Sequence, residues 1–167
     1  MGMIIKNQLK KFQVGFPTVS DKYNIAGGTL TGSTAVNFGD LVKFSSTKGY
    51  FEAITSTVTV ADIAGFVLGT NVKLALDYPA TDASVKVLPG EAFNLVLPNS
   101  FLAIELDATA VEADVVANAK AYVILATGKI TTSTNASAGT IVELPGVVFT
   151  GEYELQGTKK IAEIFVK

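Results

Sequence analysis

Apolar runs of strand length alternate with turn residues through the middle of the chain. Five such runs lie between residues 62 and 106, separated by Gly, Pro, Asn and Asp: residues 66–68, 73–76, 85–88, 92–97 and 101–106. Turn signals recur roughly every 8–12 residues, which is typical of a sandwich or barrel. Pro89 and Gly90 suit the central positions of a type II turn, because Pro presets φ and Gly accepts the positive φ that follows. The pattern predicts short strands stacked around one core.

The same pattern continues on both sides of this stretch. The further strand-like runs are residues 34–38, 41–44, 50–55, 120–125, 130–132, 140–144, 147–150, 152–155 and 160–166. Residues 41–44 and 50–54 are predicted to pair as antiparallel neighbours across a polar loop. The glycines in residues 26–28 and 31–33 predict turns, and residues 56–60 alternate as a half-exposed strand or an extended lead-in. The predicted class is all-β, a single β-sandwich or jelly-roll-like barrel, with helix below about a fifth of the residues.

One region, residues 107–121, is ambiguous. Val111, Val115 and Ala119 recur at every fourth position, and the alanine content favours a short helix. Asp114 and Asn118 permit turns instead. The sequence leaves both readings open.

The first 22 residues differ from the rest in pattern and charge. Their apolar residues have no clean period, and Gly15 and Pro17 prevent a continuous helix. They hold four lysines and one aspartate, a net charge of 4 − 1 = +3, whereas the remainder holds 9 lysines and 14 acids, a net of −5. The pattern predicts two parts, an extended N-terminal arm (residues 1–22) and a β domain (residues 23–167). The arm packs on a partner, and its removal through residue 20 should leave the domain folded; the alternative is an edge strand of the same domain.

Composition removes several kinds of chemistry. The chain has no His, Cys, Arg or Trp, and all 13 positive side chains are lysines. A Ser-His-Asp triad, a thiolate metal site, a disulfide and arginine phosphate clamps are therefore excluded, and only carboxylate catalysis stays open. The net charge of −2 disfavours nucleic acid, and the longest apolar run, residues 121–126, is far below the ~18 residues of a membrane span. The first residues also lack the pattern of a signal peptide.

Two pairs of acidic residues could bind a hard cation through oxygen. Glu105 and Asp107 are two residues apart on a predicted strand, as are Glu152 and Glu154. Charges at strand edges also discourage aggregation, which explains both pairs without a metal. We therefore predict no catalytic residue, no metal and no cofactor.

Several short motifs follow one another in a recognisable order. Residues 62–69 read Asp-Ile-Ala-Gly-Phe-Val-Leu-Gly, residues 73–78 read Lys-Leu-Ala-Leu-Asp-Tyr, and residues 89–96 read Pro-Gly-Glu-Ala-Phe-Asn-Leu-Val. Gly15-Phe16-Pro17 precedes them and residues 148–166 close the chain as a hairpin. In this order the sequence resembles the capsid cement (head decoration) proteins of tailed bacteriophages, in which an aspartate–aromatic–alanine–glycine step often begins a strand.

The resemblance implies a structural virion protein rather than an enzyme. Such a protein binds the exterior of the phage head and stabilises it, with the major capsid protein as partner and a dimer or trimer as its own assembly; neither nucleic acid nor membrane is expected as a partner. A phage tail or fibre module and a carbohydrate-binding β-sandwich are the alternatives. The residues expected to contact the capsid are Lys6, Lys10, Lys11, Phe12, Phe16 and Pro17.

Overall fold

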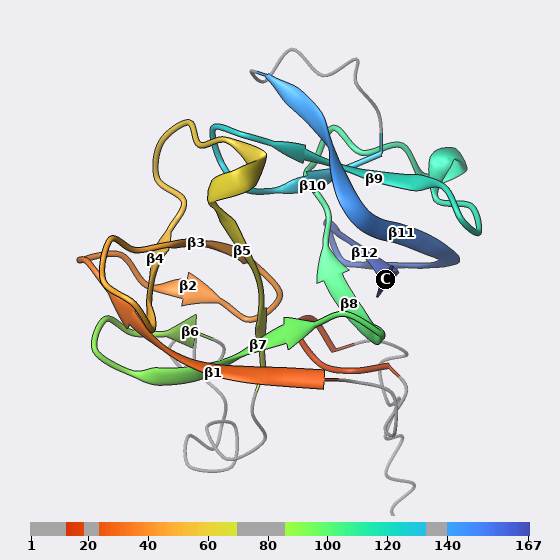
Figure 1. Cartoon of the computed structure of the whole chain (residues 1–167). Helices are drawn as coiled ribbons and strands as arrows, with labels where there is room; N and C mark the ends of the chain where they lie inside the picture. The colour runs from red at the N-terminus through yellow and green to blue at the C-terminus, as the bar shows by residue number, and fades with distance from the viewer. Residues whose placement is uncertain (1–12, 19–23, 70–85, 133–139) are drawn as a thin grey trace, which may run out of the picture.

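The computed structural model describes residues 13–18, 24–69, 86–132 and 140–167, and these residues form two larger sheets and one small one (Figure 1). A closed barrel has the order β1 (Asn24–Thr31), β4 (Tyr50–Ala53), β3 (Leu41–Phe44), β5 (Ile63–Leu68) and β7 (Ala92–Leu97). A second sheet has the order β10 (Ile130–Thr131), β9 (Lys120–Ile124), β11 (Ile141–Gln156), β12 (Lys159–Val166) and β8 (Ser100–Glu105). The small sheet pairs β2 (Val36–Asn37) with β6 (Lys86–Val87).

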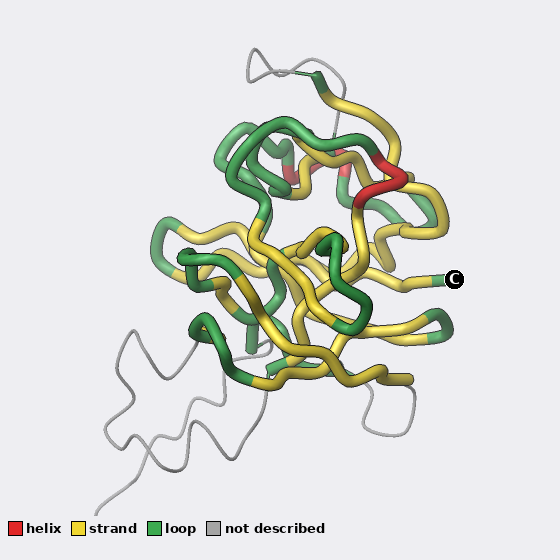
Figure 2. Tube along the Cα trace, turned by 60° about the vertical axis from the view of Figure 1, so that its left-hand side comes forward, coloured by secondary structure: helices red, strands yellow, loops and turns green. Residues whose placement is uncertain are grey.

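Within the described residues, helix is confined to short turns (Figure 2), the 3₁₀ segments η1 (Val60–Asp62) and η3 (Glu112–Asp114). The prediction of an all-β fold with a barrel is confirmed. Among the described residues, no helix combines the length and the apolarity that crossing a membrane requires.

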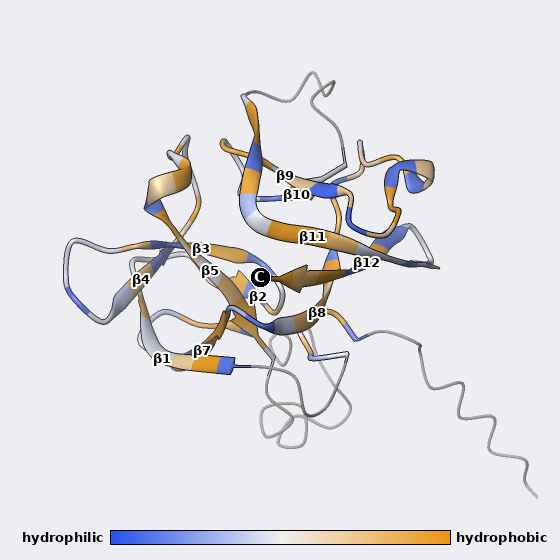
Figure 3. Ribbon diagram, turned by 45° about the vertical axis from the view of Figure 1, so that its right-hand side comes forward, coloured by the Kyte–Doolittle hydropathy of each residue, from blue (hydrophilic) through white to orange (hydrophobic). Residues whose placement is uncertain are grey.

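The barrel strands next to the second sheet are buried on both faces. Val42 and Val67 point into the barrel, whereas Leu41, Phe66 and Leu68 from the same strands join the core shared with the second sheet. Because both faces are covered, these strands read as continuous apolar runs rather than alternating ones. Figure 3 shows this hydrophobic colour along β5, in contrast to the hydrophilic loop between β3 and β4.

The second sheet curls around its own side chains. Beyond β8, Leu106 pairs in parallel with Ile130 of β10, which brings the two ends of the sheet together. Leu102, Ile104 and Phe149 fill the interior and are essentially inaccessible to solvent. The sequence predicted one sandwich or barrel, and the chain builds a closed barrel with a curled sheet beside it.

An ion pair joins the barrel to the second sheet. The ammonium of Lys129 lies 2.6 Å from one carboxylate oxygen of Asp40. The other oxygen of Asp40 accepts hydrogen bonds from the backbone N–H and the side-chain amide of Asn37, at 3.1 and 2.8 Å. Nearby, the backbone N–H of Val58 donates to the carbonyl of Leu125. The two sheets are thus linked by polar contacts as well as by their shared core.

Several predicted elements are confirmed. β3 and β4 pair as antiparallel neighbours, with Lys43 opposite Glu52. The turn at Pro89 and Gly90 has the expected form: φ of Gly90 is 87°, and the N–H of Glu91 donates to the carbonyl of Leu88 at 3.0 Å. The strand predicted at residues 73–76 lies outside the described residues.

The predicted turn at residues 26–28 is wrong, because these residues lie inside β1. Gly28 faces the ring of Phe51, and a Cβ added there would lie 2.2 Å from a ring carbon. This glycine is needed for packing and not for a turn. Gly27, one residue earlier, has open space where a side chain would lie.

Pro145 and Gly146 separate two of the predicted strands and predict a turn between them; this prediction is also wrong. β11 runs without a break through this point, so the strands predicted at residues 140–144, 147–150 and 152–155 are one bent strand. Its register shifts against β9 beside Gly146 (φ 77°) and against β12 beside Gly151 (φ 95°). Glycine with positive φ makes bulges here that bend the strand.

The structure also decides between the alternatives left open for residues 107–121 and for residues 56–60. Residues 107–119 form turns, with η3 as their only helical segment and Asn118 at φ 65°. Residues 56–59 are not a strand; they lead into η1, which begins at Val60 and where the carboxylate of Asp62 accepts hydrogen bonds from the N–H and hydroxyl of Thr59.

The two neighbouring glycines of β1 allow a matched test. We expect Gly28→Ala to lower the free energy of unfolding by about 1–2 kcal/mol, because the new methyl group displaces the Phe51 ring. Gly27→Ala should change it by less than about 1 kcal/mol in either direction, since its methyl group meets nothing. Urea unfolding of both variants measures the difference. Equal midpoints would mean that Phe51 does not rest on Gly28.

Candidate functional site

Two of the six predicted contact residues belong to a short strand-like segment that lies along β8. We call residues 13–18 the anchor segment. The N–H of Gly15 donates to the carbonyl of Ala103 at 2.7 Å, and the N–H of Ala103 donates to the carbonyl of Phe16 at 3.2 Å. Pro17 forms an antiparallel bridge with Leu102. The anchor segment therefore covers the outer edge of the last strand of the second sheet (Figure 1).

The anchor segment is also bound to the barrel. The N–H of Gly69, just after β5, donates to the carbonyl of Gly15 at 2.6 Å. The ring of Phe16 meets the ring of Phe38 edge to face, with centroids 5.9 Å apart. A Cβ on Gly69 would lie 2.3 Å from the Phe16 ring, so this glycine makes the space that the ring occupies. Six residues thus bind both sheets at once.

This geometry bears on the prediction of an extended N-terminal arm that packs on a partner. Residues 13–18 pack on the body in the manner of the edge-strand alternative, so a truncation that spares the body ends at residue 12 rather than at residue 20. The Phe16 ring points at its own barrel. The other predicted contacts, Lys6, Lys10, Lys11 and Phe12, lie outside the described residues, and their role stays a prediction.

Beside the anchor segment, the outer face of the second sheet carries a stacked aromatic pair. Phe101 of β8 and Phe165 of β12 are paired in register, with ring centroids 4.6 Å apart. Val14 of the anchor segment packs nearby on Ala103 and Ile161.

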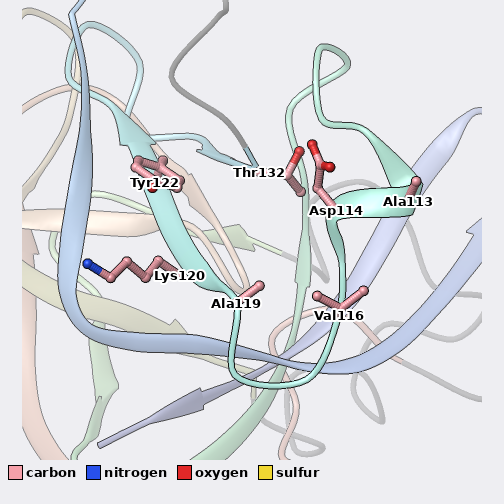
Figure 4. Close-up of a pocket in the computed structure, with 7 residues that line it drawn as sticks. All are labelled: Ala113, Asp114, Val116, Ala119, Lys120, Tyr122 and Thr132. Atoms are coloured by element: carbon pink, nitrogen blue, oxygen red, sulfur yellow. The ribbon is translucent and has the colours of Figure 1, made fainter.

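At the far side of the same sheet lies an open pocket of about 480 Å³ (Figure 4). It lies between the turn around η3 and strand β9, and its lining residues are Ala113, Asp114, Val116, Ala119, Lys120, Tyr122 and Thr132. The buried hydroxyl of Thr132 accepts a hydrogen bond from the N–H of Val111 at 2.8 Å and fixes the turn. The Lys120 ammonium donates to Glu143 at 2.7 Å, and this hydrogen bond raises the pKa of Lys120.

A second hollow, of about 330 Å³, lies where the barrel meets the second sheet. Its walls are mainly apolar and include Ile63 and Val96 from the barrel and Leu144 and Val166 from the sheet. Lys167 is the charged residue of its lining.

The acidic side chains noted in the sequence bind partners within the protein. Glu105 forms an ion pair with Lys159 at 2.9 Å, whereas Asp107 accepts hydrogen bonds from the N–H and hydroxyl of Thr109. Glu154 accepts a hydrogen bond from Gln156 at 3.2 Å. The described part of the chain holds no group of three or more acidic, histidine or cysteine side chains placed to bind a metal ion. The described residues offer a partner two surfaces, one at the anchor segment and one around the pocket beside β9.

Comparison with known proteins adds two findings. Residues 5–167 match the family model described as "Structural cement protein (E217 gp24/Pam3 gp6)". Among solved structures, a chain of "The capsid of Myoviridae Phage XM1" shares the fold, with a TM-score of 0.66 at 12% sequence identity over 100% of this chain and 97% of that one. A search of the curated proteins gives no match.

Proposed function

Because the chain belongs to the phage structural cement protein family, a capsid component of the virion, we propose that it binds the head exterior across the joints between major capsid protein subunits. The family resemblance drawn from the sequence is confirmed by this membership. The proposed contact element is the N-terminal segment, residues 1–12. The observation that carries the proposal is the anchor segment, which fixes the base of that segment to both sheets.

A contact element is useful only if force on it reaches the body. The anchor segment meets β8 through backbone hydrogen bonds at Phe101 and Ala103, and meets the barrel at Gly69. A pull on residues 1–12 is therefore resisted by two sheets together. The segment also differs from the body in charge: residues 1–22 carry a net +3 and the remainder a net −5, so an acidic surface on a partner would attract it.

Binding across a joint stabilises a shell without any chemical reaction. An interface of standard size buries about 1,600 Å² in total. A protein that contacts two neighbouring subunits makes its second contact intramolecularly, which increases retention. Its attachment should weaken only modestly with salt, because the few lysines of the segment are screened at physiological ionic strength. We propose a dimer or trimer as the form in which it binds.

Two truncations test the proposal. Removing residues 1–12 leaves the anchor segment in place, so the unfolding free energy should change by less than about 0.5 kcal/mol. Attachment to heads that lack the protein should nevertheless weaken, which co-sedimentation measures. Removing residues 1–18 also exposes the edge of β8 and should lower the unfolding midpoint.

A surface lysine provides the control for charge. Lys48 lies in the exposed hairpin loop between β3 and β4, and Lys48→Gln should leave attachment unchanged. If the chain without residues 1–12 sediments with heads as the full-length chain does, the N-terminal segment is not the contact element.

A further inference from the structure

The pocket beside β9 has the chemistry of a receptor for a lysine side chain. Ala113, Val116 and Ala119 give it aliphatic walls, and Tyr122 adds an aromatic ring. A lysine has a long apolar stem that packs on such walls and a charged end that seeks a carboxylate or an aromatic face. Asp114 supplies that carboxylate at the rim of the pocket (Figure 4).

The pocket carries one uncompensated negative charge. Within the described chain, the carboxylate of Asp114 forms no ion pair and accepts no hydrogen bond. Lys120 also lines the pocket, but its ammonium is held by Glu143 at 2.7 Å. Figure 4 shows the Lys120 side chain running away from Asp114 toward β11. The positive charge of Lys120 is therefore neutralised by Glu143, whereas the negative charge of Asp114 has no partner among the described residues.

We propose that this pocket receives a lysine from the N-terminal segment, residues 1–12, of a second copy of this chain. The proposal deepens the proposed function and rests on it, since it names a partner for the same segment. Residues 1–12 hold Lys6, Lys10 and Lys11 and no acidic residue. Their apolar neighbours would meet Val111 and Val116 beside the pocket, whose side chains are 48% and 54% exposed.

The layout of the second sheet favours a second copy over the same chain. The carbonyl of Ala119, at the pocket, accepts a hydrogen bond from Phe149, which is paired with Ile164; Ile164 is paired with Leu102, and Leu102 with Pro17 of the anchor segment. Four strand spacings thus separate the pocket from the anchor segment, about 19 Å along the sheet.

At Lys10 and Lys11 the segment of the same chain is too short to cover that distance, whereas Lys6, seven residues before Gln13, could cover it. Lys10 and Lys11 precede Gln13 by three and two residues, so their backbone lies at most about 10 Å from it. This limit on the reach of the segment does not apply to the pocket of an adjacent copy. Exchange of segments between copies would link neighbouring cement proteins on a shell, in addition to their contacts with the shell itself.

Cross-linking tests the proposal directly, because the chain contains no cysteine. We would prepare Lys10→Cys and Val116→Cys as separate single-cysteine proteins, mix them and oxidise them mildly. A covalent dimer enriched in the mixture over either protein alone is expected on a non-reducing gel. In the control, Thr47→Cys in the β3–β4 loop replaces Val116→Cys, and no enrichment is expected. Equal yields with both partners, or none with either, would overturn the proposal.

Charge changes give a second, independent measurement of self-association. Asp114→Asn should weaken it on the order of tenfold in low salt, as expected for one contact of about 1.4 kcal/mol. Lys120→Gln should strengthen it, because Glu143 is left without its partner and the pocket becomes more acidic. Glu112→Gln is the matched control: it removes one charge from the same turn, but Glu112 does not line the pocket.

Sedimentation equilibrium of the full-length chain gives these affinities. A full-length chain that stays monomeric, or an Asp114→Asn variant that associates like the unchanged protein, would refute the exchange. Head binding by the Asp114→Asn variant is measured separately. Loss of self-association with head binding retained supports the exchange and leaves the proposed function intact. Self-association without any head binding overturns the proposed function alone.

Discussion

Phage heads assembled without this protein are expected to form and then to release their DNA at a lower temperature than complete heads. A protein that binds the assembled lattice in preference to separated subunits stabilises the lattice by mass action. The gain is about 2.7 kcal/mol per site at a hundredfold excess over Kd. Because a head offers many sites, even weak binding should shift the release temperature measurably. Dye fluorescence during a thermal ramp records the release.

Adding back purified protein separates this effect from a defect in assembly. The full-length chain should restore the release temperature of deficient heads, and the chain without residues 1–12 should not. Gly27→Ala provides a folded control that should restore it fully. Superimposable release curves for deficient and complete heads would remove the basis for a stabilising role.

Elements whose signals are local were predictable from the sequence. β7 has the predicted bounds, and the pairing of β3 with β4 follows from two apolar runs and a polar loop. The turn at Pro89 and Gly90 is set by the φ preferences of those two residues alone. In each case the residues that determine the structure are neighbours in the chain.

The errors share a different physical origin, which is long-range packing. Gly28 looks like a turn residue, yet its role is to make room for Phe51, 23 positions later in the chain. Gly146 and Gly151 bend β11 where its neighbours shift register, and a sequence does not distinguish such a bulge from a hairpin turn.

In the candidate site, too, the local motif was predictable from the sequence and the long-range contacts were not. The Gly15-Phe16-Pro17 motif stood out in the sequence, but its packing depends on Gly69 and Phe38, which nothing local connects to it. The pocket was missed altogether, because the turns of the ambiguous region bring Asp114 beside β9. No signal in the sequence identifies that arrangement.

The anchor segment should depend strongly on a single ring. We expect Phe16→Ala to lower the free energy of unfolding by about 3 kcal/mol, the low end for loss of a buried ring, because Phe16 is only partly buried. This corresponds to a decrease in Tm on the order of 10 °C. Attachment to heads should also weaken, since a loosened anchor segment lets residues 1–12 sample a larger volume.

A double-mutant cycle with Gly69 tests whether the ring lies where the structure places it. Gly69→Ala alone should destabilise the protein, because its methyl group would lie 2.3 Å from a ring carbon of Phe16. In the Phe16→Ala background the same change should cost little, since the obstructing ring is gone, and the two effects should fall short of additivity. Phe44→Ala is the control: that ring is 57% exposed at the other side of the barrel, and its loss should add independently to Gly69→Ala. Strict additivity of Phe16→Ala and Gly69→Ala would show that the ring does not occupy the space beside Gly69. The anchor segment would then be joined to the barrel without the Phe16 ring, through the hydrogen bond from the Gly69 N–H to the Gly15 carbonyl.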